Sequence, residues 1–209
     1  METIRGKVSL NLDMTDLYAR LANYDRILLD LGTGDGKFAF CHADNFPSHF
    51  VIGVDSCREN LHEHSRAKLP NLLYIIANAQ SLPHELHGLV SHITINFPWG
   101  SLLESMLAGD DRLLHGLESV LDSSAALDVR LNGGALAEQG WSLEDGVERI
   151  FENLTSAGWN LRKPEILDSR ALRAFPSTWA KRLAFGRDPR AVQLSGCLQK
   201  KSGHIQSVS

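Results

Sequence analysis

The stretch that decides the fold is DLGTGDG, residues 30–36. It follows the short apolar run 27–31, which has the composition of a buried strand, and a helix is expected from Lys37 onward. Glycines let the backbone turn tightly and approach a ligand with no side chain in the way. The spacing is G-x-G-x-G rather than the G-x-G-x-x-G of dinucleotide-binding folds, and no Lys-Ser/Thr pair follows as in a P-loop. The stretch therefore predicts a ligand-binding turn between a strand and a helix.

Apolar strands and helices alternate along the rest of the chain. Further strands are expected at 51–54, 72–76, 92–97, 125–131, 161–167 and 191–198, and helices at 58–68, 113–121, 142–157 and 171–185. This alternation predicts an α/β fold with a parallel sheet and helices on both faces, which binds ligands beyond the carboxyl ends of its strands. We expect one domain over residues 1–209, in which residues 1–26 are a small extension with a short strand at 8–12.

Composition and charge narrow the functional classes. The chain is 43% hydrophobic and 22% charged, its three cysteines form no C-x-x-C, and it has neither a signal peptide nor an apolar run of about 18 residues. We therefore expect a soluble cytoplasmic protein without a membrane or metal site. Ten basic and three acidic residues lie between 162 and 201, so this segment carries +7 while the whole chain carries −4. The segment is either a polyanion-binding surface or a solvated basic helix beside an acidic neighbour.

Asp55 ends the second strand about 20 residues after the glycine-rich turn. An acid at this position can accept both hydrogens of a ribose diol. The pairing resembles class I S-adenosylmethionine (SAM)-dependent methyltransferases, and the resemblance implies that Asp30 faces the methionine part of SAM. It also implies that Ala79 and Gln80, after the third strand, meet the adenine through a backbone N–H and a side chain. The alternatives are a turn without a ligand and a Gln80 that faces water.

The fourth strand ends in NFPWG, residues 96–100, where the substrate should meet the methyl group. Asn-Pro-Pro-aromatic sequences serve adenine amino-methylating enzymes here, and the resemblance is partial because Phe97 replaces one proline. Trp99 is therefore expected at the target base, with a plain loop tryptophan as the alternative. A second aromatic, Trp179, lies among basic residues in FPSTWAKRLAFGR, residues 175–187. Such interleaving stacks bases and holds phosphates, unless the segment is an amphipathic helix packed on the sheet.

Together, DLGTGDG, FPWG and WAKRLAFGR resemble the Kam-type aminoglycoside-resistance 16S rRNA methyltransferases, which modify N1 of an adenine in the decoding A site. The resemblance spans residues 5–196, and WAKRLAFGR is its most specific part. It implies a class I, Rossmann-like fold with a mostly parallel seven-stranded sheet. It implies that Trp99 and Trp179 stack on either side of the flipped adenine beside Phe97 and Pro98. The implied SAM-binding residues are Asp30, Gly32, Thr33, Gly34, Asp55, Ala79, Gln80 and Ser177, and the implied RNA-binding residues are Lys181, Arg182, Arg187 and Arg190.

The chain departs from the family at two places. Gln80 stands where glutamate is expected, and the connection 132–141 is short and glycine-rich where family members carry a longer RNA-contacting linker. These departures leave open a SAM-binding RNA-docking protein with weak or no catalysis. A second rival is a tRNA (guanine-N7) methyltransferase, because that family also has Phe-Pro-x-x-Trp after the fourth strand. The resemblance implies a monomer that acts on the 30S subunit with SAM as its cofactor. No pair of histidines has metal-site spacing with an acid partner.

Overall fold

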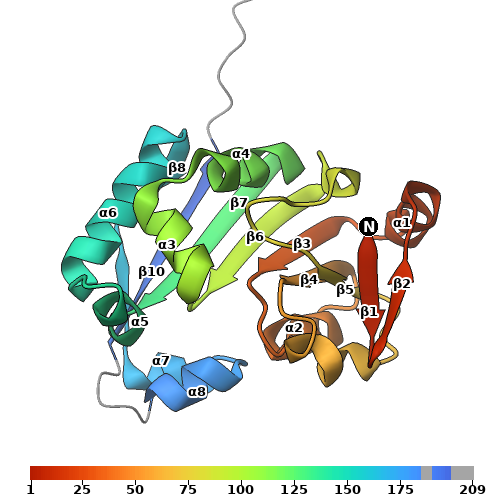
Figure 1. The fold of residues 1–209 in the computed structure, drawn as a ribbon, viewed down its shortest axis with the longest axis horizontal. Helices are drawn as coiled ribbons and strands as arrows, with labels where there is room; N and C mark the ends of the chain where they lie inside the picture. Colours follow the sequence, from red (N-terminus) through yellow and green to blue (C-terminus); the bar gives the residue numbers. More distant parts are fainter. Residues whose placement is uncertain (185–189, 199–209) are drawn as a thin grey trace, which may run out of the picture.

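The computed structural model describes residues 1–184 and 190–198, and its centre is one mixed sheet of ten strands (Figure 1). The sheet order is β2-β1-β5-β4-β3-β6-β7-β10-β8, and β9 also pairs with β10. The five parallel strands are β3 (Arg26–Leu31), β4 (His49–Asp55), β5 (Leu72–Ile76), β6 (Val90–Asn96) and β7 (Leu121–Asn132). The antiparallel strands are β1 (Glu2–Arg5), β2 (Val8–Asn11), β8 (Trp159–Leu161), β9 (Glu165–Leu167) and β10 (Ala191–Leu198).

The α/β fold is as expected, but the strand count of seven is wrong. The sequence predicted one strand over 161–167, and the structure has β8 and β9 instead, with Pro164 between them. Proline has no N–H to donate to a neighbouring strand, so pairing stops there and resumes further along β10. The predicted strand at 8–12 forms, and it pairs with a strand at residues 2–5 to make a hairpin that extends the other edge of the sheet.

Helices cover both faces of the sheet. They are α1 (Met14–Leu21), α2 (Lys37–Asn45), α3 (Gly100–Ala108), α4 (Asp111–Val120), α5 (Gly133–Glu138), α6 (Leu143–Ser156), α7 (Ser169–Ala174) and α8 (Thr178–Ala184), with 3-10 helices η1 (Asn60–His62), η2 (His64–Arg66) and η3 (His84–Leu86). The predicted start of α6 is confirmed, since the Ser142 hydroxyl oxygen accepts the Asp145 N–H at 3.0 Å. The glycine-rich connection after β7 forms the short helix α5.

Two predicted helices are broken. Residues 58–68 form two 3-10 turns rather than an α-helix, because buried Leu61 and a hydrogen bond from the Gly6 N–H to the Ser65 hydroxyl (2.9 Å) pin the segment to the hairpin and sheet. The helix expected over 171–185 divides into α7 and α8 at Pro176. A residue before proline favours an extended backbone, and Phe175 has ψ 130°. This break gives the segment the corner that sets α8 against the strand ends.

The carboxyl ends of β3, β4 and β6 form the edge at which function is expected. The pair α7–α8 lies there, apart from the α3, α4 and α6 layer (Figure 1). A small apolar cluster of Phe97, Leu172, Ala180 and Ala191 joins the pair to the sheet. In the described part of the chain, no helix is both long enough and apolar enough to cross a membrane.

Candidate active site

The glycine-rich turn after β3 is folded tightly against β4. The backbone N–H groups of Gly32 and Thr33 both donate to the Val54 carbonyl oxygen at 2.9 Å. Gly32 has φ 69°, and a Cβ there would lie 2.6 Å from the Leu102 side chain, so only glycine fits. Gly34 has φ 59° and open space around its Cα. The turn therefore presents backbone, not side chains, to the space beyond the sheet.

Asp55, at the end of β4, is held by the same turn. One carboxylate oxygen accepts the Gly34 N–H at 2.9 Å and the other accepts the Cys57 N–H at 2.8 Å. Burial raises the pKa of this carboxyl above its usual value, although both backbone donors oppose the shift. The Asn60 side chain is a third hydrogen-bond partner, and because a carboxylate offers about four acceptor sites, acceptor capacity remains for a ligand hydroxyl.

Asp30 is the most enclosed acid of the site. Only 1% of its surface is exposed, and its carboxylate accepts the Thr94 hydroxyl and the Asn96 amide, each at 2.8 Å, and the Thr33 hydroxyl. Burial raises the pKa of Asp30 to about 6 despite these donors. At neutral pH the Asp30 carboxylate is thus ionised and held in place by its donors, while its burial lowers the stability of the ligand-free fold. Such a site suits a cationic ligand. Thr94 and Asn96 were missed from sequence, although their period-two spacing on β6 places both on one face of the sheet.

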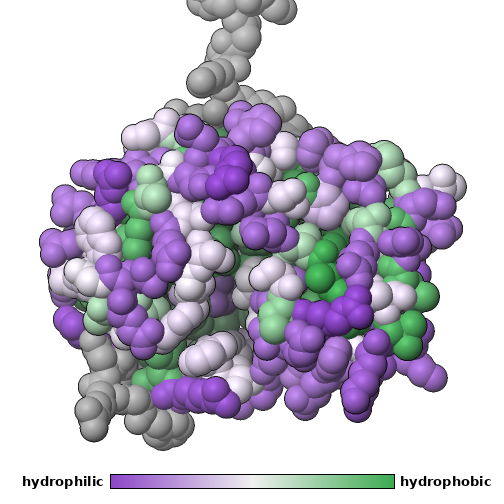
Figure 2. Space-filling view, viewed as in Figure 1, coloured by the Kyte–Doolittle hydropathy of each residue, from purple (hydrophilic) through white to green (hydrophobic). Residues whose placement is uncertain are grey.

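A cavity of about 420 Å³ opens beside these acids, within the size range of small-molecule sites. Figure 2 shows the surface hollowed above α7 and α8, with pale residues in the walls. The predicted residues that line the cavity are Asp30, Gly32, Thr33, Gly34, Asp55, Ala79, Gln80, Phe97, Trp99, Ser177 and Trp179. Pro98 is buried beside it, and Lys181, Arg182 and Arg190 are not among its lining residues.

Gln80 enters the cavity in a fixed orientation. Its amide nitrogen donates to the Ser105 hydroxyl at 2.6 Å and to the Asp110 carboxylate at 3.3 Å. The Asp110 carboxylate accepts only, so it fixes which end of the amide is the nitrogen. The amide oxygen of Gln80 is then available to accept a hydrogen bond from a ligand amine.

Trp99 and Trp179 come together although 80 residues separate them in sequence. Their ring centroids are 5.9 Å apart with an interplanar angle of 21°. The two side chains are 48% and 45% exposed, so neither packs in the core. A base between two rings needs about 7 Å, twice the stacking distance of about 3.4 Å. The gap between the ring planes is no larger than the distance between their centroids, so the pair would have to open by at least about 1 Å to admit a base.

The turn before Trp99 is strained. Phe97 has φ 54°, a backbone region costly for a residue with a bulky side chain. Its N–H donates to the Arg130 carbonyl oxygen at 2.8 Å, and its buried ring packs edge-on against Phe175 at 5.6 Å. Buried Phe97 and Pro98 thus shape the turn that carries the Trp99 ring into the cavity.

Helix α8, which carries Trp179, is tied directly to the glycine-rich turn. The Thr178 hydroxyl donates to the Asp35 carboxylate at 2.6 Å, although 143 residues separate the two. Ser177, just before it, is buried in the cavity wall, and its N–H donates to the Phe175 carbonyl at 2.8 Å. Neither Asp35 nor Thr178 was singled out from sequence, because the long-range approach of α8 has no local signal.

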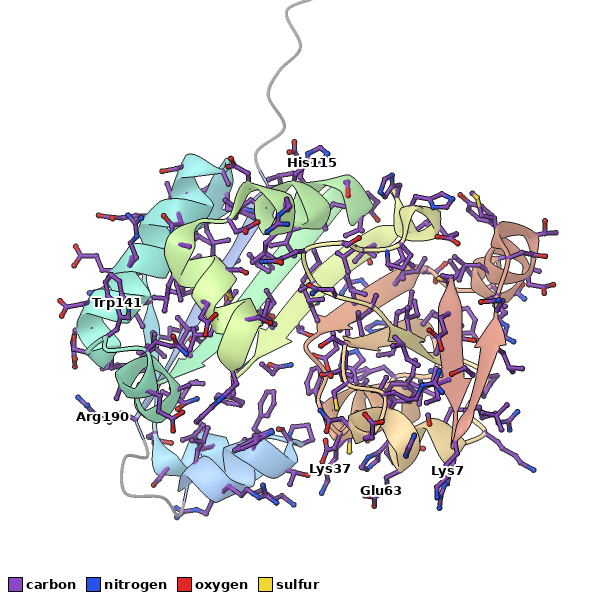
Figure 3. All side chains as sticks on the ribbon, viewed as in Figure 1. Lys7, Lys37, Glu63, His115, Trp141 and Arg190 are labelled. Atoms are coloured by element: carbon purple, nitrogen blue, oxygen red, sulfur yellow. The ribbon has the colours of Figure 1, made fainter. Side chains whose placement is uncertain are left out.

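Three of the four predicted RNA-binding residues are described by the structure, and none of the three lines the cavity. Lys181 and Arg182 are exposed on α8, and the Arg182 guanidinium lies 5.3 Å from the centre of the Trp179 ring. Arg190 forms an exposed ion pair with Glu144 at 3.1 Å and lies at the lower left of the molecule, beside α5 (Figure 3). Arg187 lies outside the described residues. No group of three or more metal-binding side chains occurs among the residues that the structure describes.

Comparison with known proteins identifies the family. The family model described as 16S rRNA (adenine(1408)-N(1))-methyltransferase (NpmA) matches residues 2–198. The chain belongs to this methyltransferase family. A relative of that name from Escherichia coli is 30% identical over 96% of this chain and 100% of its own. Another, from Streptoalloteichus hindustanus, is 32% identical over 90% of this chain and 94% of its own.

Solved structures of the methyltransferase family share the fold. The crystal structure of the 16S rRNA methyltransferase KamB is 30% identical, with a TM-score of 0.85 over 95% of this chain and 100% of its own. A mutant of the 16S rRNA (adenine(1408)-N(1))-methyltransferase from Catenulisporales acidiphilia, solved with cosubstrate SAM, is 25% identical, with a TM-score of 0.84 over 97% of this chain and 98% of its own.

Proposed function

We propose that this chain methylates N1 of an adenine in the decoding A site of 16S rRNA, within the 30S subunit, with SAM as methyl donor, and that the product confers aminoglycoside resistance. The observation that carries the proposal is the exposed Trp99–Trp179 pair, which lines the same cavity as Asp30 and Asp55. The named relatives support the same target, since each is a 16S rRNA (adenine(1408)-N(1))-methyltransferase.

The donor set of the cavity fits SAM. The buried Asp30 carboxylate suits an ammonium group, because a cation there relieves the cost of a buried charge. Asp55 retains acceptor capacity for the ribose hydroxyls, while Gly32, Thr33 and Gly34 form the turn around the ligand. Ala79 and the amide oxygen of Gln80 would meet the adenine N1 and N6 atoms, and the fixed orientation of the Gln80 amide supports this role for glutamine where glutamate was expected. Ser177 closes the wall nearest Trp179.

Catalysis at this site consists of positioning. When bound, SAM supplies an electrophilic methyl group on its sulfonium. N1 of adenine carries its own lone pair, so no residue of the chain has to remove a proton from the nucleophile. The work of Trp99 and Trp179 is to hold the flipped base in line, and good alignment can contribute up to about 7–11 kcal/mol. Aromatic stacking also offsets the few kcal/mol needed to flip the base, and the ring faces favour the cationic product.

The partner is RNA held mainly through its phosphates. Lys181, Arg182, Arg187 and Arg190 are assigned this role, and phosphate contacts orient the enzyme without reading sequence. Recognition then depends on the shape of the assembled 30S subunit, which places the enzyme in the cytoplasm. We infer a single methyltransferase domain over residues 1–209, with 1–26 as its extension, because the hairpin pairs into the same sheet. We also infer that it acts as a monomer.

Labelled SAM distinguishes this function from its rivals. The enzyme is incubated separately with 30S subunits, naked 16S rRNA and tRNA, and transfer of the labelled methyl group is counted. We expect strong labelling of 30S subunits, little of naked rRNA and none of tRNA. Labelled tRNA would favour the guanine-N7 alternative. SAM binding without labelling of any RNA would favour an RNA-docking protein that has lost catalysis.

A further inference from the structure

Arg130, near the end of β7, contacts the residue that binds Asp30 and the aromatic residues next to the tryptophan segments. Its guanidinium donates to the Asn96 side-chain oxygen at 2.8 Å and lies over the Phe175 ring, 4.8 Å from its centre. Its backbone carbonyl accepts the N–H of the strained Phe97 at 2.8 Å. One residue therefore contacts both halves of the site, and neither the sequence motifs nor the assigned roles account for it.

The hydrogen bond between Arg130 and Asn96 determines which end of the Asn96 amide faces the Asp30 carboxylate. Arg130 has only donors, so it binds the oxygen end of the Asn96 amide. That choice leaves the nitrogen end to donate to the Asp30 carboxylate at 2.8 Å. If the amide turned over, its oxygen would face the buried carboxylate and repel it. Both ends of the Asn96 amide are thereby engaged within the protein.

The contact between the Arg130 guanidinium and the Phe175 ring holds the aromatic residues that pack next to the tryptophan segments. Phe175 stacks on Phe38 at 5.2 Å with an interplanar angle of 2°, and it packs edge-on against Phe97. It is also the corner between α7 and α8, four residues before Trp179, while Phe97 is two residues before Trp99. A shift of the Phe175 ring therefore reaches the backbone that carries each tryptophan.

We infer that Arg130 is a positioning residue, which orients Asn96 toward the Asp30 carboxylate and fixes the Phe175–Phe97 packing beneath the Trp99–Trp179 pair. The inference deepens the proposed function and rests on it for the role of the tryptophans. Lysine cannot replace arginine here. A planar guanidinium can stack on a ring while donating in its own plane, whereas an ammonium is a compact, strongly hydrated point charge.

Arg130→Met and Arg130→Lys test this role against Arg149→Met as a matched control. Arg149 is an exposed arginine on α6 whose side chain donates to the Leu107 carbonyl at 3.1 Å, and it does not line the cavity. The measurements are the single-turnover rate of methyl transfer to 30S subunits at saturating SAM, the SAM Kd by calorimetry at pH 7.5 and pH 6.0, and the melting temperature.

We expect both Arg130 variants to lower the single-turnover rate at least tenfold, while the Kd for SAM at pH 7.5 changes less than about threefold. For the wild type, an Asp30 pKa of about 6 makes the Kd at pH 6.0 about twice that at pH 7.5. Removal of a nearby positive charge in Arg130→Met favours protonated Asp30, so this ratio should exceed two. The Arg149→Met control should match the wild type in its single-turnover rate and in the ratio of its SAM Kd at pH 6.0 to that at pH 7.5.

An arginine that only stabilises the fold would give different results for the transfer rate and for the pH dependence of the SAM Kd. A Lys variant with wild-type rate, or a Met variant whose Kd ratio stays at two, would overturn the inference, whatever the melting temperature. If the wild-type enzyme transfers no methyl group to any RNA, the proposed function fails. The Arg130 inference is then decided by the pH dependence of SAM binding, which needs no activity.

Discussion

Substitution of either tryptophan should change the rate of methyl transfer strongly and the melting temperature only slightly. Each ring is almost half exposed, so Trp99→Ala or Trp179→Ala removes only part of the 3–5 kcal/mol that a fully buried aromatic contributes. We expect a loss of about 2 kcal/mol or less, which in a chain of this size lowers the melting temperature by about 4–8 °C. Stacking of a base contributes about 1–3 kcal/mol per ring, or roughly 5- to 150-fold in transfer.

Single-turnover transfer to 30S subunits, SAM calorimetry and a thermal melt of each variant measure these effects. SAM affinity should stay within about twofold, because Asp30 and Asp55, and neither tryptophan, supply the charged groups proposed to hold SAM. Phenylalanine at either position should retain part of the activity. The double alanine variant should lose less than the product of the single losses, because one ring alone does not sandwich a base. The reasoning is refuted if transfer survives both single substitutions, or if SAM affinity falls in parallel with transfer.

Three further predictions concern the acids and the basic surface. Asp55→Ala should weaken SAM binding at least tenfold, since a hydrogen bond to a charged group is worth about 1.5–3 kcal/mol, and unchanged calorimetry in a folded variant would remove Asp55 from the site. The folded-state pKa of Asp30 is raised from 3.8 to about 6, so ionisation of Asp30 costs the ligand-free fold up to about 3 kcal/mol as pH rises through this window. Asp30→Asn should therefore raise the melting temperature without SAM at pH 7.5 while weakening SAM binding; a lower melting temperature would contradict the sign. Binding to 30S subunits should fall steeply with salt, and Arg182→Gln should reduce the slope of log K against log salt by about one, with an unchanged slope excluding a phosphate contact.

The parts of the site that local sequence patterns encode were predicted correctly. The strand–turn–helix around residues 30–36 and the acid at Asp55 lie where the order of apolar runs and glycines predicts them. Gln80 and Trp99 follow strands whose carboxyl ends share one edge, so they also enter the cavity as expected.

The missed residues act through contacts between distant segments. Arg130 looks like an ordinary strand residue until β7 is paired beside β6, which places it against Asn96. The bond from Thr178 to Asp35 depends on the corner at Pro176, and a helix expected to run straight through 171–185 could not predict it. Only one sequence pattern indicated these contacts: alternate residues of β6 share one face of the sheet, which places Thr94 and Asn96 together beside Asp30.

The most direct test of the proposed reaction is the chemical identity of the methylated nucleoside. Wild-type enzyme and the Trp99→Ala variant are incubated with 30S subunits and labelled SAM, and the 16S rRNA is digested and analysed by mass spectrometry. The account predicts 1-methyladenosine from a single position in the decoding A site with the wild type, and a large loss of it with the variant. Label in any other nucleoside or at another site, or equal yields from the two enzymes, would contradict it.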